Sequence, residues 1–217
     1  SAGQRCSALR ALFLPDTIAE RVIELLTGAM RELAIGAPQY IQNDLGPLID
    51  EAAWTRVQAH NTRLTEANKK IIAIDASTLK NQGFYLGPAV FELSSLDELP
   101  EEIFGPVLHI IRYRSRDLDE VLAQINRSGY GLTLGIHSRI ESTLRTIVKQ
   151  ARVGNIYVNR NMIGAVVGVQ PFGGEGLSGT GFKAGGPHYL LRFATERTLS
   201  VNTAAVGGNT ALAVLQS

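Results

Sequence analysis

Apolar residues recur at helical spacing in the first third of the chain. Between Thr17 and Gly36 they follow one another mostly at intervals of three or four, at Ile18, Val22, Leu25, Leu26, Met30 and Leu33. This period predicts a helix, for which Thr17 and Glu20 have the spacing of a capping box and Gly36 is the stop. A second amphipathic helix is predicted over residues 50–68, with Ala53, Val57 and Leu64 on its apolar face. Residues 3–12 are predicted to be a turn that runs into a helix.

Short apolar runs alternate with amphipathic segments in the next part of the chain. Strands are predicted at residues 71–75, 83–93, 107–113, 132–136 and 156–159, the second of them interrupted by Gly87-Pro88. Two helices are predicted between the last three strands. The first is expected to begin at Asp117 and end near Gly129, and the second to begin at Ser138 and end at Gly154. This rhythm of strand and helix is typical of an α/β fold with a mostly parallel sheet flanked by helices.

The composition of the chain changes after Asn161. Residues 164–187 are rich in glycine and predict a long loop, and loops of that length are usually functional or disordered. Within it, Gly174–Gly179 matches the dinucleotide-binding pattern G-x-G-x-x-G. Because Pro171 precedes the match and more glycine follows, we expect no Rossmann turn there. A strand is possible over residues 198–205.

Composition excludes several classes of function. The chain has 217 residues, a net charge of +1 and no block of basic residues, so nucleic-acid binding is not expected. One cysteine rules out a disulfide within the chain, and the four histidines lack metal-ligand spacing, so no metal site is expected. No apolar run is long enough to span a membrane and the first residues do not form a signal peptide, so we expect a cytoplasmic protein.

Cys6 is the first candidate for chemistry. It follows Arg5 at the predicted junction of a turn and a helix. A helix N-terminus and a neighbouring cation both stabilise a thiolate, which is the nucleophilic form of cysteine. The pattern therefore favours a nucleophile, although a lone cysteine is more commonly a buried, inert residue.

Three segments carry a family resemblance. They are Gly3-Gln4-Arg5-Cys6-Ser7-Ala8, then Glu101-Glu102-Ile103-Phe104-Gly105-Pro106-Val107, and then Gln170-Pro171-Phe172-Gly173-Gly174 followed by Ser178-Gly179. In this order and at these separations they resemble the signature segments of aldehyde dehydrogenases. Arg5-Cys6-Ser7, Gly164–Gly168 and Gly185–Leu190 are similar to the branch that oxidises L-glutamate γ-semialdehyde. The tail Val201–Asn209 is similar to the end of the bifunctional proline-utilisation proteins.

The resemblance implies a covalent mechanism with NAD as the cofactor. Cys6 would attack the aldehyde to give a thiohemiacetal, hydride would pass to the nicotinamide, and water would hydrolyse the resulting thioester. The backbone N–H of Cys6 would help to bind the oxyanion. Glu102 would bind the ribose hydroxyls of the nicotinamide half, and Phe104 would pack near the nicotinamide.

The same resemblance implies a site for the carboxylate end of the semialdehyde. Backbone N–H groups of Gly164 and Ala165 would anchor the carboxylate, as exposed glycine-rich backbone can do. Ser7 would add a hydroxyl donor, and Phe172 would cover the aliphatic stem. The alternative is a flexible surface loop in which Phe172 fills the core.

The resemblance also implies a division of the chain and groups that lie outside it. Residues 1–196 would be the catalytic domain, incomplete at its N-terminus, and residues 197–217 an oligomerisation strand and tail of a homo-oligomer. The Rossmann cofactor domain, the general-base glutamate and the oxyanion asparagine would lie upstream, and FAD would belong only to a proline dehydrogenase domain further upstream. The chain alone would then be inactive.

Three alternatives stay open at this point. The chain could be a non-catalytic module for association, or an aldehyde dehydrogenase with another substrate. It could also be a thiol enzyme of another class, such as a hydrolase that pairs Cys6 with one of the histidines at positions 60, 109, 137 and 188.

Overall fold

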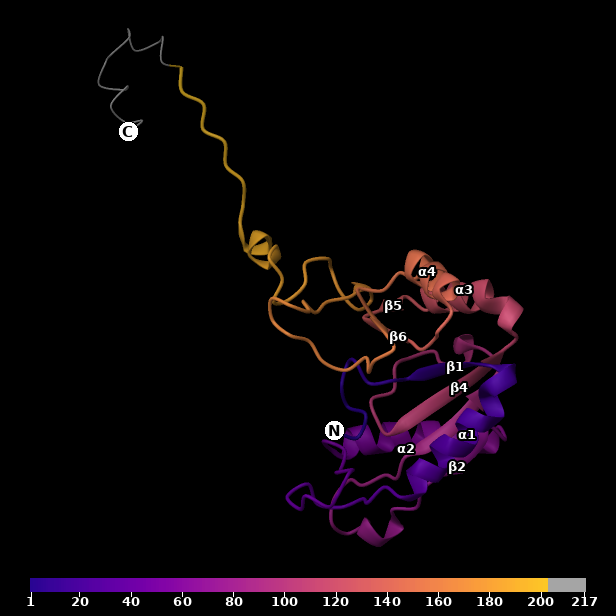
Figure 1. The fold of residues 1–217 in the computed structure, drawn as a ribbon. Coiled ribbons are helices and arrows are strands. Elements are labelled where there is room, and N and C mark those ends of the chain that lie inside the picture. Colours follow the sequence, from indigo (N-terminus) through magenta and orange to yellow (C-terminus); the bar gives the residue numbers. More distant parts are fainter. Residues whose placement is uncertain (203–217) are drawn as a thin grey trace.

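Four strands form the main sheet of the molecule, in the order β1-β4-β3-β2 (Figure 1). The structure is a computed structural model that describes residues 1–202. The strands are β1 (Ala11–Pro15), β2 (Lys70–Ala73), β3 (Ala89–Leu93) and β4 (Val107–Tyr113). β4 pairs parallel with both β1 and β3, and β2 pairs antiparallel with β3 at the edge.

One long helix covers each face of this sheet. They are α1 (Asp16–Arg31) and α2 (Glu51–Glu66). Because successive side chains of a strand point to opposite faces, Phe91 packs with Val57 and Leu64 of α2, while its neighbour Val90 packs with Ile23 of α1. The result is a three-layered arrangement of helix, sheet and helix, with an apolar core on each face of the sheet.

A smaller lobe follows β4. Its helices are α3 (Leu118–Arg127) and α4 (Glu141–Gln150), and its strands are the parallel pair β6 (Thr133–Ile136) and β7 (Asn155–Val158). Leu122, Ile136 and Ile147 form a separate apolar core between these elements. An antiparallel pair, β5 (Tyr130–Gly131) and β8 (Glu175–Gly176), ties the glycine-rich loop to the lobe. Short 3-10 turns complete the elements, at Ser77–Leu79, Leu96–Glu98, Ser115–Asp117 and Tyr189–Phe193.

The α/β class is confirmed, but the strands do not make one sheet: β6 and β7 pair only with each other among the described strands. The prediction of a helix within residues 3–12 was wrong. The first ten residues form turns, and the chain then enters β1. The parallel pairing of β1 with β4, distant in sequence, outweighs the local helical pattern.

Two expected helix caps are also absent. α1 begins directly after β1, with Pro15 at the N-cap, so Thr17 lies inside the helix and makes no cap. α4 has Ile140 at its N-cap, and Ser138 Oγ accepts a hydrogen bond from Ile140 N instead. α2 begins as the pattern predicts, because the Asp50 side chain accepts from Ala53 N at 2.8 Å.

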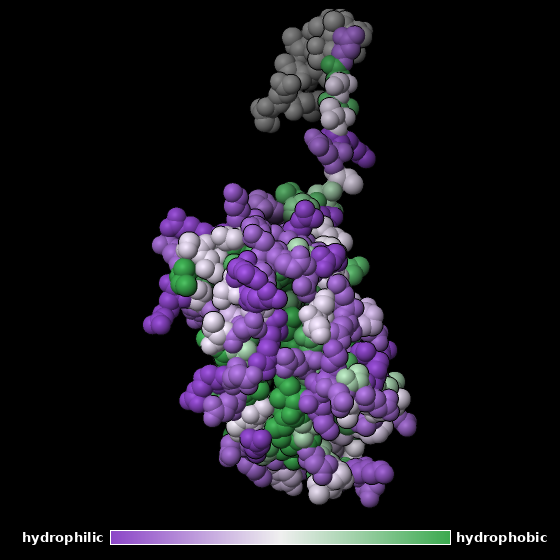
Figure 2. All heavy atoms as spheres, turned by 90° about the vertical axis from the view of Figure 1, so that its right-hand side faces the viewer, coloured by the Kyte–Doolittle hydropathy of each residue, from purple (hydrophilic) through white to green (hydrophobic). Residues whose placement is uncertain are grey.

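The chain leaves the body as an extended arm after the glycine-rich loop (Figure 1). Leu190, Phe193 and Leu199 on this arm are exposed. Residues 198–202 form no strand, and the rest of the expected strand, 203–205, lies outside the described residues. Figure 2 shows that apolar side chains also reach the surface of the body, in a band between polar ones. In the described part of the chain, no helix is both long enough and apolar enough to cross a membrane.

Candidate active site

Cys6 lies in a tight turn before β1. Ala8 N donates to Arg5 O at 3.1 Å, which folds the chain back at the cysteine. The Cys6 side chain is exposed. The helix that we expected to begin here does not form, so no helix dipole acts on the thiol; the turn instead leaves the sulfur open to a substrate.

The Gln4 side chain ties this turn to the segment that precedes α2. Its Nε2 donates to Pro47 O at 3.4 Å and to Ser1 O at 3.0 Å, while its Oε1 accepts from Ile49 N at 2.9 Å. Both ends of the amide are therefore used. The residue two before the cysteine is held between two parts of the chain, which limits how far the turn can move.

The cysteine turn touches the Glu102–Phe104 segment through two glycines. Gly3 has a φ of +68°, and a Cβ there would lie 2.0 Å from Gly105 O. Gly105 is enclosed on its other side, where a Cβ would lie 2.6 Å from Val57 Cγ2 of α2. The close approach of Gly3 to the Gly105 backbone requires glycine at position 3, and the Val57 side chain leaves no room for a Cβ at position 105. The first two sequence motifs therefore meet in space.

The Arg10 side chain joins the two motifs. Its Nη1 donates to Gly3 O at 2.6 Å and its Nη2 to Arg5 O at 2.8 Å. Its Nε pairs with Glu102 Oε1 at 3.3 Å, and its Cζ lies 4.5 Å from the centroid of the Phe104 ring. Burial lowers the pKa of Arg10, against the opposing charges of Glu102 and Cys6. A cation thus sits between the nucleophile turn and the Glu102 carboxylate.

Two buried histidines lie beneath Arg10. His109 Nδ1 is 2.8 Å from Arg10 O, and its Nε2 is 2.8 Å from His60 Nε2 of α2. Since Arg10 O only accepts, His109 carries its proton on Nδ1 and accepts from His60. Burial, His109 and Arg63 lower the pKa of His60 to about 4, and burial lowers the pKa of His109. The pair is neutral and serves as a support for β4 and α2.

This pairing bears on the thiol-hydrolase alternative. His60 and His109 bind each other, so neither acts as a base on Cys6 in the manner of a thiol hydrolase. Among the described residues, no group of three His, Cys, Asp or Glu side chains is placed to hold a metal ion.

Strand β7 holds the glycine-rich loop. Asn155 Nδ2 donates to Pro171 O at 3.0 Å, and its Oδ1 accepts from Gly173 N at 3.2 Å. The buried Asn155 amide therefore grips the backbone on both sides of Phe172. Phe172 itself exchanges backbone hydrogen bonds with Ala184. The ring of Phe172 is consequently carried on a backbone fixed from two directions.

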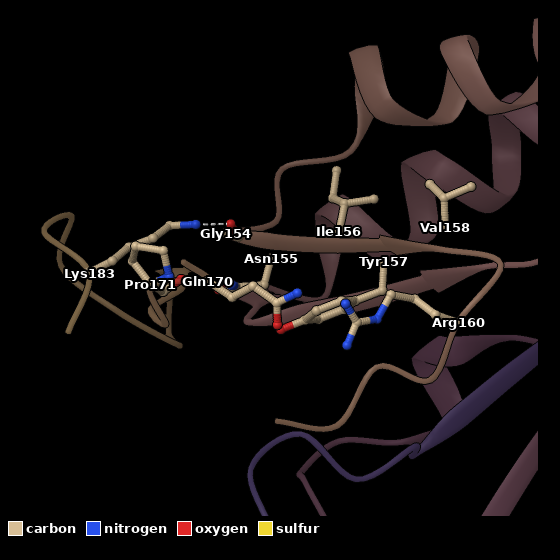
Figure 3. A pocket seen from close by; sticks show the side chains of 9 residues that line it. All are labelled: Gly154, Asn155, Ile156, Tyr157, Val158, Arg160, Gln170, Pro171 and Lys183. Carbon is tan, nitrogen blue, oxygen red and sulfur yellow. Dashed lines mark hydrogen bonds between the residues drawn. The ribbon is translucent and has the colours of Figure 1, made fainter. Parts of the chain in front are cut away.

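A pocket of about 340 Å³ lies between β7 and this loop (Figure 3). Asn155 and Tyr157 point to one side of β7, and Ile156 and Val158 point to the other side, toward the helices; all four line the pocket. Tyr157 Oη donates to Gly164 O at 2.9 Å, and Arg160 Cζ lies 5.4 Å from the Tyr157 ring. Lys183 donates to Gly154 O across the same pocket. The carbonyl of Gly164 faces β7, and β7 thereby orients the segment expected to anchor a carboxylate.

Residues 1–199 match the aldehyde dehydrogenase family. The chain belongs to this family. It is 49% identical over 203 residues to the bifunctional protein PutA of Klebsiella aerogenes. The aligned region covers 91% of this chain but 15% of that protein. It is 33% identical to the 1-pyrroline-5-carboxylate dehydrogenase of Geobacillus sp. strain WCH70, covering 91% of this chain and 38% of that protein. The chain thus spans about one seventh of the PutA relatives that it matches.

Solved structures show the same relationship. The proline utilization A protein of Bradyrhizobium japonicum, as the D779W mutant, aligns with a TM-score of 0.87 and 56% identity over 94% of this chain and 21% of that chain. The 1-pyrroline-5-carboxylate dehydrogenase from Thermus with bound NAD aligns with a TM-score of 0.77 and 35% identity over 88% of this chain and 37% of that chain.

The aldehyde dehydrogenase motifs do not all meet in this structure. The Cys6 turn lies beside the Glu102–Phe104 segment, through Gly3 with Gly105 and through Arg10. No hydrogen bond among residues 1–201 joins the 164–174 segment to the cysteine turn; that segment is held by β7 and by its own loop. Ser7 is 5% exposed, so its role as a hydroxyl donor to substrate stays a prediction. The dinucleotide-like hexapeptide forms β8 and a turn, and no helix follows it before Tyr189.

Sequence reasoning missed three residues that support the candidate site: Arg10, Asn155 and Tyr157. Arg10 directly precedes β1, and Asn155 and Tyr157 are buried residues of β7. Arg10 had one available signal, since it directly precedes the apolar run Ala11–Leu14 and follows the cysteine motif. Nothing local reveals the partners of Asn155 and Tyr157, because these lie on the far loop.

Proposed function

We propose that this chain is the thiol-bearing part of an NAD-dependent enzyme that oxidises L-glutamate γ-semialdehyde to L-glutamate in proline catabolism. The single observation that carries the proposal is the contact between two motifs. An exposed Cys6 lies in a turn whose backbone packs against Gly105, next to Glu102 and Phe104. A nucleophile and a cofactor-contacting turn must be adjacent for hydride transfer to follow nucleophilic attack.

The residues beside Cys6 suit the nicotinamide end of NAD. Glu102 is 25% exposed, and Arg10 engages its Oε1, which leaves Oε2 to accept from ribose hydroxyls. Phe104 is 40% exposed and offers a flat apolar surface. NAD, when bound, supplies the hydride acceptor for the reaction. The carboxylate, ring and thiol of this chain would fix the position of the acceptor relative to the sulfur.

Cys6 would form the covalent bond to substrate. Its Sγ attacks the aldehyde carbon, the C=O electron pair moves to oxygen, and the N–H of Cys6 donates to that oxygen. After oxidation the acyl group remains on sulfur as a thioester, and attack by water releases the acid and restores the thiol. The base that activates this water would come from outside the 217 residues.

The preference for a semialdehyde with a carboxylate rests on the loop after β7. Tyr157 binds Gly164 O, which orients the backbone on either side of it, and the N–H groups of Gly164 and Ala165 would bind the carboxylate. Asn155 fixes the backbone around Phe172, whose ring would cover the substrate's methylene groups. The relatives named as 1-pyrroline-5-carboxylate dehydrogenases support this choice of substrate.

We further propose that the activity belongs to a longer polypeptide, which also supplies the cofactor domain and joins a homo-oligomer through residues 197–217. The share of the PutA relatives that this chain covers, 15%, supports the longer polypeptide. The 217-residue chain alone should give no aldehyde-dependent NADH. Formation of NADH by the isolated chain at the rate of a complete enzyme would contradict this part of the proposal.

The test uses the longer protein with glutamate semialdehyde and NAD, and follows NADH. We expect Cys6→Ala to lower kcat by roughly a thousandfold or more, since the nucleophile is lost. The substrate is tested by comparing kcat/KM with that for butanal, which lacks a carboxylate. Equal values for the two aldehydes would reject the anchoring loop but not the aldehyde dehydrogenase chemistry.

A further inference from the structure

We propose that Arg10 is a positioning residue that holds the Cys6 turn and the Glu102–Phe104 turn at a fixed separation. The inference rests on the proposed function, because it assigns the residue that sets the geometry between the nucleophile and the nicotinamide. Arg10 touches neither reacting atom. It acts through the groups that it binds.

All three nitrogens of the Arg10 guanidinium bind one of the two turns. Two donate to the carbonyls of Gly3 and Arg5, which lie on the N-terminal side of Cys6. The third pairs with one oxygen of Glu102. Its flat face lies over Phe104. A planar fork with several fixed donors can make all these contacts at once, and the single ammonium of lysine cannot.

The anchor of this side chain is rigid. Arg10 O accepts from His109 N at 3.1 Å and lies 2.8 Å from His109 Nδ1, so the residue is fixed to β4 on its main-chain side. His60 of α2 fixes His109 in turn. The side chain of Arg10 is only 16% exposed, so its charge is weakly screened. The sheet therefore fixes Arg10, and Arg10 in turn fixes the Cys6 turn and the Glu102–Phe104 turn.

The experiment compares Arg10→Gln and Arg10→Lys with Arg112→Gln in the longer protein. Arg112 is a matched control, because it is likewise an arginine paired with glutamate side chains, Glu20 of α1 and Glu92 of β3, away from Cys6. We expect Arg10→Gln to raise KM for NAD about tenfold and to lower kcat by roughly 10–100-fold, as misplacement of reacting groups does. Arg10→Lys should be intermediate, since it keeps the charge and loses the fork. Arg112→Gln should change the midpoint of thermal unfolding only.

A second readout is independent of turnover. The rate at which iodoacetamide alkylates Cys6 at pH 7, followed on the Cys6 peptide by mass spectrometry, should change in Arg10→Gln and not in Arg112→Gln, because the turn that carries Cys6 loses the donors to Gly3 O and Arg5 O. If Arg10→Gln and Arg112→Gln give the same kcat, KM and alkylation rate, Arg10 is merely structural and the inference is wrong. If the unaltered protein oxidises no aldehyde but the alkylation rate still changes in Arg10→Gln alone, the proposed function fails and the positioning role stands.

Discussion

At the scale of single residues, Gly3 is where the backbone is least tolerant of change. We expect Gly3→Ala to lower the free energy of unfolding by roughly 1–3 kcal/mol, because a Cβ at a φ of +68° would also strike Gly105 O. Gly28 in α1 is the matched control, since a Cβ there would meet nothing within 4 Å. Gly28→Ala should stabilise the chain by about 0.5–1 kcal/mol, as alanine does within a helix. Urea unfolding of both variants measures the difference, and equal effects would refute the close approach.

The buried pair His60–His109 gives the chain a pH dependence of stability. Burial and His109 lower the pKa of His60 from 6.5 to about 4, so between these pH values the unfolded chain binds a proton that the folded chain does not. Stability is therefore complete above pH 6.5 and falls as pH decreases toward 4, by up to about 3 kcal/mol.

Thermal unfolding between pH 4 and 7 measures this slope. His60→Gln should flatten it, while replacement of the exposed His137 by glutamine should leave it unchanged. An equal slope in His60→Gln and in the unaltered chain would show that the pair does not carry the effect.

At the scale of elements, β7 governs the glycine-rich loop through Asn155. Removing its amide leaves Pro171 O and Gly173 N without their partner, at a cost of about 1–3 kcal/mol. We expect Asn155→Ala to speed cleavage by trypsin after Lys183, which lies in the released loop. In the longer protein it should also raise KM for the semialdehyde more than KM for NAD.

Asn126 provides the control for this prediction. Its amide makes the same two kinds of bond, to Gln150 O and from Arg152 N, but between α3 and the end of α4. Asn126→Ala should destabilise the lobe without faster cleavage after Lys183. Identical cleavage patterns in the two variants would mean that Asn155 has no special hold on the loop.

At the scale of the whole molecule, the α3–α4 lobe has a core of its own, separate from the two cores of the main sheet. Phe91 and Ile110 belong to the cores on the two faces of the main sheet, while Leu122 belongs to the core of the α3–α4 lobe. Leu122→Ala should cost about 2–5 kcal/mol within that lobe. Because local cores open separately, hydrogen exchange should quicken in β6 and β7 before it does in β3 and β4. Uniform acceleration through all four strands would instead show one cooperative unit.

Local pattern was sufficient wherever an element depends on its own neighbours. β4 covers Val107–Tyr113, as its run of apolar residues predicted, and α2 begins at the Asp50 cap. The pattern failed for residues 3–12, because β1 is stabilised by pairing with β4 rather than by its own sequence. It also failed for the Thr17 cap, since β1 runs directly into α1.

The sequence alone therefore predicted most of the elements from α1 to β7, the three motifs and Cys6 as the candidate nucleophile, because periodicity and motif spacing are properties of neighbouring residues. Tertiary structure decided which motifs meet. Gly3 lies against Gly105, and Arg10 lies between Cys6 and Glu102, only because β1 and β4 are adjacent in the sheet. Such contacts join residues far apart in the chain, and their geometry follows from strand pairing and packing, which no local pattern encodes.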